Sequence, residues 1–336
     1  MKEKILIFGP CAVESEQQLA EIVAEKCHFP DFFGQIIFRG GIWKPRTSPQ
    51  TFQGVGEKAL PWLKNAGQKM GYPVATEVAN TQHIQACVEA GVDYCWIGAR
   101  TSVNPILVQE LADYWQQIPR EHLPKGILVK NPMAQDVALW MGAVERLQTL
   151  GVPIWAIHRG INHKACWGMA FEFRQKKHDI PMLLDPSHIS GDANMVAKLA
   201  QQAMDLDYDG LMIEVHPHPT EALSDAKQQI TMNELQTLLN TLIVRTTNTP
   251  NKSMLELREQ IDEIDDELWN LLVKRLELSR QIGKIKKENN EPILQVNRLD
   301  NIIQQRIDWG KKHQLPSGFV EQMMHLIHEQ SVEEQM

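Results

Sequence analysis

The sequence lacks the features that mark secreted and membrane-spanning proteins. It has no CxxC pair, and its five cysteines are scattered along 336 residues. An odd number of unpaired cysteines indicates reduced thiols and a cytoplasmic protein rather than a disulfide framework. No apolar run approaches the roughly 18 residues that a membrane span needs. The apolar run after the N-terminus is also too short for a signal peptide.

An excess of positive charge is also missing. The chain has 34 Lys and Arg against 42 Asp and Glu, a net charge of -8. This balance argues against binding of nucleic acid through bulk charge. An anionic ligand would therefore have to be met by a local cluster of cations. Hydrophobic residues make up 43% of the chain, enough for a sizeable core, and the length suits one large domain or two unequal ones.

The first 217 residues contain eight short apolar runs, separated by segments with apolar residues at i, i+3 and i+4. The runs are KILIFG, QIIFR, PVATEV, DYCWIG, GILVK, VPIWAIH, PMLLD and GLMIEV. Continuous apolar strands that alternate with amphipathic helices indicate a parallel sheet covered by helices. Eight such repeats predict a (β/α)8 barrel of the TIM type. A doubly wound open sheet is the alternative.

The composition changes after residue 245. We interpret residues 246–253, which are polar and contain a proline, as a linker between a barrel at 1–245 and a second domain at 254–336. Residues 254–289 show one long helical pattern, and two shorter ones follow at about 297–313 and 317–335. Such a long helix cannot be covered by two short partners. We therefore expect an all-α, three-helix domain that pairs with a second copy of itself.

Four residues with metal-binding side chains follow expected strands of the barrel. They are Cys11, His188, Glu214 and Asp225. In barrel enzymes the loops after the strands form the active site, so these side chains are expected to meet on one rim. A thiolate, an imidazole and two carboxylates suit a divalent transition metal such as Mn, Fe, Co or Zn. Each residue taken singly is more often a buried or solvated group than a ligand.

Cations also cluster after the expected strands of this acidic protein. They are Arg39, Lys44, Arg46, Arg100, Lys130 and Arg159. A single Arg or Lys is usually a solvated charge or a carboxylate's partner. Six of them exceed what one phosphate needs, and Arg and Lys recognise phosphate and carboxylate strongly. We infer at least two anionic groups, on two substrates.

The motifs GPCAVES, FRGGIWKPRTSPQTFQG, GAR…N, DPSH and EVHP resemble the type I, beta-subgroup 3-deoxy-D-arabino-heptulosonate-7-phosphate (DAHP) synthases, over residues 1 to about 245. The resemblance implies a metal-dependent barrel that condenses phosphoenolpyruvate with erythrose 4-phosphate. It implies Cys11, His188, Glu214 and Asp225 as the metal ligands. It implies a phosphoenolpyruvate site of Lys44, Arg100, Lys130 and Arg159. For erythrose 4-phosphate it implies Arg46 and Thr47, with Asn104 and Asp185 nearby.

A related family, the 3-deoxy-octulosonate 8-phosphate synthases, shares the barrel and the phosphoenolpyruvate chemistry. An Asn stands near the Lys in those enzymes, where this chain has Pro45 in KPRTSP. This difference favours the heptulosonate reaction, and the octulosonate reaction is the alternative.

The C-terminal segments LELREQIDEIDDELWNLLVKRLELSRQIGKIK, NR and HEQSVEEQ resemble the all-helical chorismate mutases, over about residues 254–336. The resemblance implies an intertwined dimer and a site for chorismate and prephenate. The matching positions are Arg258, Arg275, Lys286, Arg298, Ser331 and Gln335, with Arg258 reaching across the dimer. Gln295 and Leu299 stand where some members carry acidic residues. The domain is thus expected to be a working mutase, with a binding and dimerising module as the alternative.

The joining of these two domains suggests a form of regulation. The first expected strand begins almost at Met1, so we expect the C-terminal domain, and not an N-terminal one, to control the barrel. Prephenate, the product of the mutase reaction, is the expected inhibitor.

Overall fold

The computed structural model describes residues 3–45, 48, 50–245 and 250–336. Arg46 and Thr47 lie outside the described residues. The chain divides into two compact units, Met1–Thr246 and Thr247–Met336. The sequence predicts a barrel over residues 1–245, a linker over 246–253 and a helical domain over 254–336.

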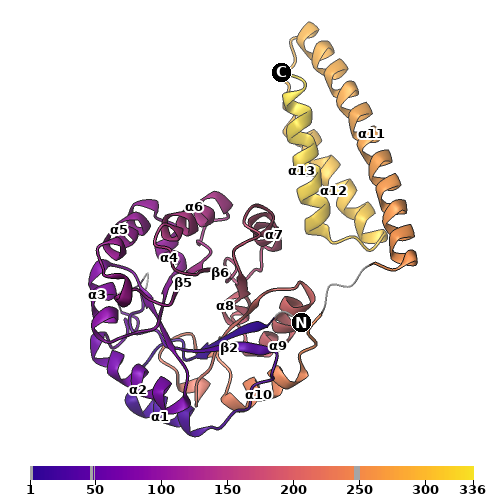
Figure 1. The fold of residues 1–336 in the computed structure, drawn as a ribbon. Coiled ribbons are helices and arrows are strands. Elements are labelled where there is room, and N and C mark those ends of the chain that lie inside the picture. Colours follow the sequence, from indigo (N-terminus) through magenta and orange to yellow (C-terminus); the bar gives the residue numbers. More distant parts are fainter. Residues whose placement is uncertain (1–2, 46–47, 49, 246–249) are drawn as a thin grey trace. The chain divides into compact units, whose positions relative to one another are not determined.

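The first unit is a closed barrel in which eight parallel strands pair in chain order, from β1 next to β2 round to β8 next to β1 (Figure 1). The strands are β1 Lys4–Gly9, β2 Phe33–Arg39, β3 Val74–Val78, β4 Tyr94–Ile97, β5 Gly126–Lys130, β6 Ile154–His158, β7 Met182–Leu184 and β8 Gly210–Glu214. The closed order confirms the predicted TIM barrel, and the alternative of an open, doubly wound sheet is wrong.

Helices follow the strands and cover the outside of the barrel (Figure 1). The α-helices are α1 Glu16–Ala24, α2 Leu60–Met70, α3 Thr81–Glu89, α4 Ala99–Ser102, α5 Pro105–Gln116, α6 Val137–Gln148, α7 Trp167–Lys176, α8 Pro186–Ser190, α9 Ala193–Asp205 and α10 Met232–Thr241. Short 3₁₀ helices lie at η1 Glu57–Ala59, η2 Arg120–His122, η3 Pro219–Glu221 and η4 Ala226–Gln228.

Two hydrophobic clusters explain why the strands are apolar on both faces. Ile7, Trp96 and Met212 belong to a cluster that fills the barrel, whereas Leu6 and Phe8 belong to a larger cluster between the strands and the helices. Successive side chains in a strand point to opposite faces, so each strand contributes to both clusters. The continuous apolar runs in the sequence are the result.

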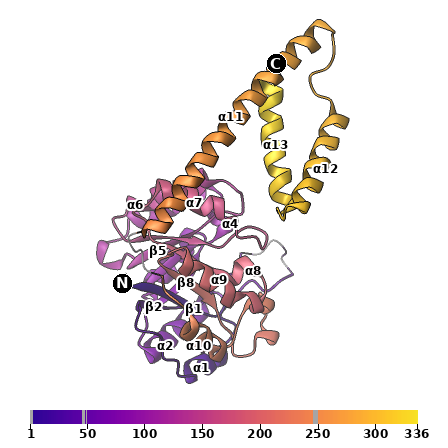
Figure 2. The same ribbon diagram turned by 90° about the vertical axis from the view of Figure 1, so that its right-hand side faces the viewer.

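The second unit consists of three helices: α11 Lys252–Glu288, α12 Val296–Lys312 and α13 Ser317–Glu333. The long first helix begins where the Asn251 side chain accepts a hydrogen bond from the Met254 amide. It runs unbroken for 37 residues, about 55 Å at 1.5 Å per residue. Figure 2 shows α11 as one rod, beside which α12 and α13 form a hairpin. The three-helix prediction is confirmed.

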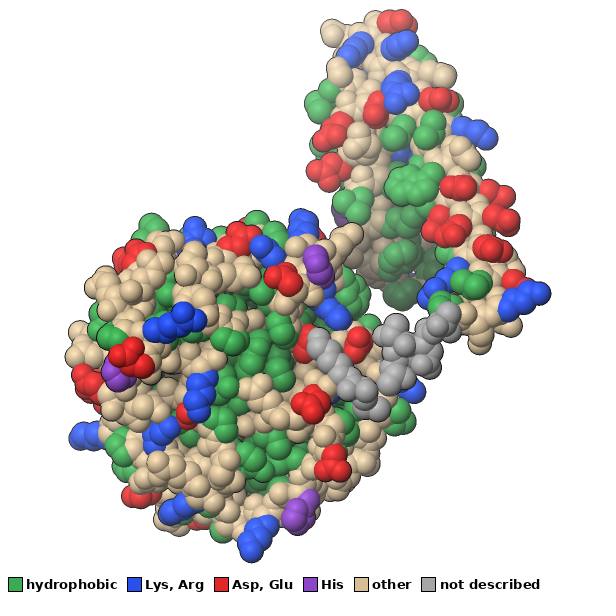
Figure 3. Space-filling view, in the orientation of Figure 1, with side chains coloured by type: hydrophobic (Ala, Val, Ile, Leu, Met, Phe, Trp, Pro, Cys, Tyr) green, Lys and Arg blue, Asp and Glu red, His purple; other side chains and the backbone are tan. Residues whose placement is uncertain are grey.

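Much of the apolar surface of α11 is uncovered in the single chain. Ile264, Trp269 and Leu271 are 61%, 65% and 64% exposed, and Figure 3 shows hydrophobic side chains gathered on the face of this unit. A soluble monomer rarely leaves such a contiguous apolar stripe open. Within the described residues, no helix combines the length and the hydropathy required to span a bilayer.

Candidate functional sites

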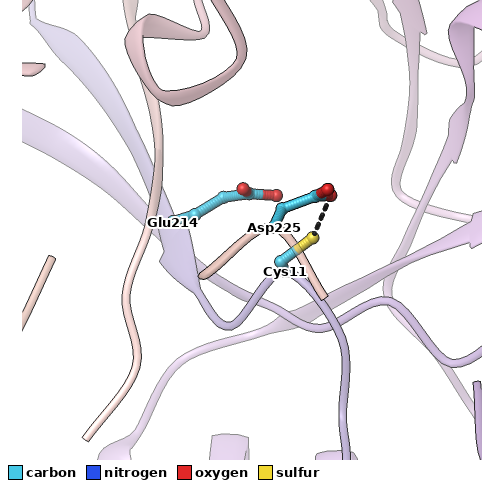
Figure 4. A group of neighbouring side chains, drawn as sticks. All are labelled: Cys11, Glu214 and Asp225. Carbon is cyan, nitrogen blue, oxygen red and sulfur yellow. Dashed lines mark hydrogen bonds between the residues drawn. The ribbon is translucent and has the colours of Figure 1, made fainter. Parts of the chain in front are cut away.

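Three of the predicted metal ligands meet on one rim of the barrel (Figure 4). Cys11 follows β1, Glu214 ends β8, and Asp225 precedes η4. One ligand atom from each lies within 4.8 Å of the others. The Cys11 thiol donates a hydrogen bond of 3.0 Å to Asp225 Oδ2, and both Cys11 and Glu214 are buried. Strand ends therefore place one thiol and two carboxylates around a common point.

The fourth predicted ligand, His188, stands at the edge of this cluster. Its Nε2 lies 3.7 Å from Glu214 Oε1, and its Nδ1 lies 2.8 Å from Asp185 Oδ2. Asp185 also accepts a hydrogen bond from the His188 amide, which begins α8. A carboxylate on one ring nitrogen fixes the ring and leaves the other nitrogen directed toward Glu214. The fold thus gathers three of the predicted ligands and places His188 beside them.

The donor set fits a divalent transition metal. Glu214 Oε1 is buried and accepts no hydrogen bond from the residues that the structure describes, although the Arg39 guanidinium lies 3.2 Å away. Its other oxygen accepts 2.7 Å from the Gln228 amide. One carboxylate oxygen is therefore held and the other is available for a ligand bond.

The protonation of the cluster is set by burial and by the neighbouring charges. Burial opposes the ionisation of Glu214, but His188 and Arg39 outweigh it and lower the pKa of this carboxyl. Burial, with Glu214 beside it, raises the pKa of the Cys11 thiol. A metal would have to displace the thiol proton on binding.

A cavity of about 230 Å³ opens beside this cluster. Its lining includes four predicted cations, and these are Lys44, Arg100, Lys130 and Arg159. The Lys130 ammonium pairs with the buried Asp185 at 2.9 Å, and the Lys44 ammonium lies 2.9 Å from the Cys11 sulfur. Two of the predicted metal ligands, His188 and Asp225, also line the cavity, so they border the same space as the cations.

The cations of this cavity are held by neighbouring groups of the barrel. Arg159 donates from its guanidinium to the Gly160 carbonyl and from its amide to Asn131. Burial lowers the pKa of the Arg159 guanidinium, and the nearby Arg100 adds to the effect. His188 and Lys130 outweigh burial and hold the pKa of Asp185 well below its usual range. Such a site favours an anion, which would relieve the repulsion among the cations.

Two residues predicted to lie near erythrose 4-phosphate, Asn104 and Asp185, do not line this cavity. Asn104 is exposed and caps α5 by accepting from the amides of Ile106 and Leu107, and it does not line this cavity. Asp185 is fully buried behind His188 and Lys130. Asp185 is therefore placed to orient these two side chains.

Sequence reasoning missed several residues that line the cavity. Glu77, Met133, Asn162, His163 and Gln228 all do so. Glu77 accepts a hydrogen bond of 3.0 Å from the Trp96 indole. Its position at the end of β3 was a usable signal, whereas nothing in the sequence pattern marked Gln228.

The helical unit gathers three of its six predicted residues. The Arg275 guanidinium on α11 donates to the Ser331 hydroxyl and to the Ile327 carbonyl on α13. The side-chain amide of Gln335 donates a hydrogen bond of 2.9 Å to the Ser331 backbone carbonyl. Gly283 of α11 allows Gln335 to lie close to this helix, because a Cβ at position 283 would lie 2.7 Å from the Gln335 Cα. Arg275, Ser331 and Gln335 thus form one polar strip between α11 and α13.

The other three predicted residues stand apart from this strip in the single chain. Lys286 donates at 2.5 Å to the Ile293 carbonyl in the loop after α11. Arg258 and Arg298 are exposed. Arg298 lines a shallow groove that also includes Gln295.

A family model described as the DAHP synthetase I family matches residues 2–250. The chain belongs to this family. A second model, described as chorismate mutase type II, matches residues 257–336. The DAHP synthetase barrel therefore carries a chorismate mutase domain at its C-terminal side, and both domains are of enzyme type.

Known proteins resemble the DAHP synthetase barrel in sequence. The phospho-2-dehydro-3-deoxyheptonate aldolase of Thermotoga maritima is 34% identical over 232 residues, which is 67% of this chain and 64% of that protein. The chain thus spans less than two thirds of that relative's length. A 2-dehydro-3-deoxyphosphooctonate aldolase of Wolinella succinogenes is 28% identical over 71% of this chain and 98% of its own.

Solved structures resemble the DAHP synthetase barrel as well. The crystal structure of the Thermotoga maritima DAHP synthase is 29% identical, with a TM-score of 0.58 over 71% of this chain and 68% of that one. A truncated form of the same synthase gives the same TM-score and identity and is covered over 85% of its length. The rim cluster thus lies in a barrel of DAHP synthase architecture.

Proposed function

We propose that the chain is a bifunctional enzyme of the shikimate pathway. Its barrel condenses phosphoenolpyruvate with erythrose 4-phosphate to DAHP and phosphate, and its C-terminal domain rearranges chorismate to prephenate. The observation that carries the first activity is the rim cavity, where Lys44, Lys130 and Arg159 border the same space as His188 and Asp225. Two anionic substrates and a divalent metal each find suitable groups there.

In this proposal Cys11, His188, Glu214 and Asp225 hold a divalent metal. The bound metal would supply a Lewis acid for the aldehyde of the sugar. Asp185 fixes the imidazole ring of His188, and Gln228 fixes one oxygen of Glu214. These supporting contacts set the direction of the ligand atoms before the metal arrives.

The cations perform the other part of the reaction. Lys44, Arg100, Lys130 and Arg159 bind the phosphate and carboxylate of phosphoenolpyruvate, and Arg46 and Thr47 bind the sugar phosphate, with Asn104 and Asp185 assigned nearby from the resemblance. The enol carbon of phosphoenolpyruvate forms the new bond to the aldehyde carbon. Water adds to the phosphate-bearing carbon, and phosphate leaves. The cationic rim offsets the repulsion between the two substrates and fixes their approach.

The alternative for the barrel is the octulosonate reaction. The Wolinella relative, named as an octonate aldolase, is covered over nearly its whole length. Pro45 lines the cavity directly after Lys44, and it is the residue that favours the heptulosonate reaction. Turnover with erythrose 4-phosphate supports the proposal, whereas turnover with arabinose 5-phosphate alone would establish the alternative.

The mutase activity rests on the polar strip of Arg275, Ser331 and Gln335, with Lys286 and Arg298 added from the same chain. Cations at these positions would bind the two carboxylates of chorismate, and Lys286 and Gln335 would stabilise the charge that develops on the ether oxygen. Chorismate disappearance measured on the full chain tests this. Binding of chorismate without turnover would indicate a regulatory and dimerising module instead.

A homodimer through the chorismate mutase domain follows from the open apolar stripe of α11. Pairing with a second copy would cover Trp269 and its neighbours and would bring Arg258 of one copy to the other's site. Sedimentation equilibrium of the full chain tests this, and a monomer at micromolar concentration contradicts it.

Five free cysteines suit a reducing, cytoplasmic setting.

Feedback control is the last part of the proposal. Prephenate bound at the mutase domain would inhibit the synthase barrel of the same chain. Inhibition should then disappear when Arg275→Ala abolishes prephenate binding, while the uninhibited synthase rate stays unchanged. Persistent inhibition in that variant would place the effector site in the barrel.

A further inference from the structure

A histidine of α13 stands in the polar strip of the helical unit. His328 lies one residue after Ile327 and three before Ser331, and the Arg275 guanidinium donates to both of those neighbours. Side chains three and seven residues apart on a helix share a face. His328 and Ser331 therefore lie in one row along α13, which Gln335 continues just past the end of the helix, opposite Arg275 of α11.

Two buried polar atoms in this row have no hydrogen-bond partner among the described residues. They are Nε2 of His328 and Oε1 of Gln335. Ser331 and Gln335 are buried, with exposures of 3% and 9%. A buried polar atom left without a partner is costly, and native proteins rarely keep one without a reason. Two such atoms in one row indicate a place where a polar ligand binds.

Among the described residues, the charges that most affect the pKa of His328 are positive. Arg275 and Lys286 act on it from α11, and His325 acts on it from its own helix. On the α12 side, Arg306 adds positive charge next to Arg275. Burial, followed by these cations, lowers the pKa of His328. The imidazole of the ligand-free protein is therefore neutral at pH 7.

A dicarboxylate ligand would reverse this balance. Its negative charge would attract the His328 imidazolium and so offset the repulsion of that imidazolium by Arg275 and Lys286. Protonation also makes both ring nitrogens of His328 hydrogen-bond donors. The Nε2 of His328 would then donate a hydrogen bond to a carboxylate of the ligand.

We propose that His328 is a further ligand-binding residue of the mutase site, whose imidazolium donates a hydrogen bond from Nε2 to a carboxylate of the bound dicarboxylate. Ligand binding is then coupled to the uptake of one proton by His328. This inference rests on the proposed mutase function, and it adds a pH-sensitive group to that site.

The test is isothermal titration of prephenate into the full chain between pH 6 and pH 8, in two buffers of different ionisation enthalpy. The wild-type chain should bind prephenate more tightly as the pH falls, by up to about tenfold per pH unit. The observed enthalpy should depend on the buffer, because a proton is taken up. His328→Leu should weaken binding at pH 6 by roughly tenfold and remove the buffer dependence.

Two further variants separate the titration of His328 from loss of its shape and from titration of a neighbour. His328→Asn keeps a polar group that does not titrate, so it should also lose the proton uptake if it folds as the wild type does. His325→Leu removes an exposed neighbouring histidine whose charge acts on His328, and it should keep the uptake of one proton on binding.

Each result is decisive. Unchanged proton uptake in His328→Leu and His328→Asn would overturn the inference while leaving the mutase function intact. Failure of the wild-type chain to bind prephenate or to turn over chorismate would overturn the mutase function itself, and the inference with it.

Discussion

The Lys44 ammonium lies 2.9 Å from the Cys11 sulfur and 3.1 Å from the Cys11 carbonyl oxygen. This contact joins the two predicted halves of the barrel site, because Lys44 belongs to the predicted cation set and Cys11 to the predicted metal ligands. Lys44 also lines the cavity. One side chain therefore stands where phosphoenolpyruvate and the metal would meet.

We predict that Lys44→Ala raises the KM for phosphoenolpyruvate by about tenfold to a hundredfold, since a hydrogen bond to a charged group contributes about 1.5–3 kcal/mol. Arg46→Ala is expected to raise the KM for erythrose 4-phosphate more than that for phosphoenolpyruvate. Steady-state kinetics with each substrate varied in turn checks both. Lys58→Ala, at an exposed lysine of the same barrel, is the control. The opposite pattern of KM changes would reverse the substrate assignment of this loop.

Removing the amide that holds Glu214 should weaken metal binding. Gln228→Leu deletes the hydrogen bond to Glu214 Oε2, and loss of such a supporting contact typically costs 10-fold to 100-fold in metal affinity. Competition with a fluorescent chelator measures the affinity of the full chain for Mn²⁺ or Zn²⁺. Gln85→Leu, at an exposed glutamine of α3, should leave it unchanged. Equal affinities for the Gln228 variant and the wild type would show that Gln228 does not support the site.

The buried His158 should make the stability of the barrel depend on pH. It is buried at the end of β6 between the Tyr208 hydroxyl and the Ala165 carbonyl, and burial lowers its pKa to about 4. The unfolded chain, with a pKa near 6.5, binds the proton more readily. The stability that this group contributes is thus fully present above about pH 6.5 and is lost as the pH falls toward 4.

The size of this loss can be measured by urea unfolding of the barrel at pH 7.5 and pH 4.5. A pKa difference of this size corresponds to about 3 kcal/mol. His158→Gln cannot titrate, so its stability should fall less over the same interval. An equal fall in both proteins would assign the acid sensitivity to other groups.

Gly283→Ala should destabilise the helical unit, although alanine is the better helix former. The new Cβ would lie 2.7 Å from the Gln335 Cα and 2.9 Å from its carbonyl oxygen, and overpacking of this kind costs about 1–3 kcal/mol. Chorismate turnover should drop as Gln335 is displaced, while the synthase rate is unaffected. Gly318→Ala is the matched control, because its Cβ would meet no atom within 4 Å. Equal activity in the two variants would contradict the tight approach of α13 to α11.

The barrel could be predicted because its strands contribute to two cores at once. Runs such as that around Ile7 and Phe8 are apolar at every position, and the helical segments between them have a different period. The strand ends also located Cys11 and Glu214, because the order of strands in a closed barrel brings all the following loops to one rim.

Other parts of the site depend on packing that no pattern records. Arg39 belonged to the cation set, yet the fold buries it against Glu214 and over the Trp96 ring. Asn104 has the position of a rim residue, but its side chain caps a helix. Gln228 and His328 carry no periodic signal, and only the folded chain shows which side chains they approach.

The most direct test of the proposed metal-dependent condensation is the rate of phosphoenolpyruvate consumption by the full chain with erythrose 4-phosphate, measured before chelation, after chelation and after metal is restored. We predict turnover that is lost with the chelator and returns with a divalent metal. Turnover that persists after the metal has been removed, or that requires arabinose 5-phosphate, would contradict it.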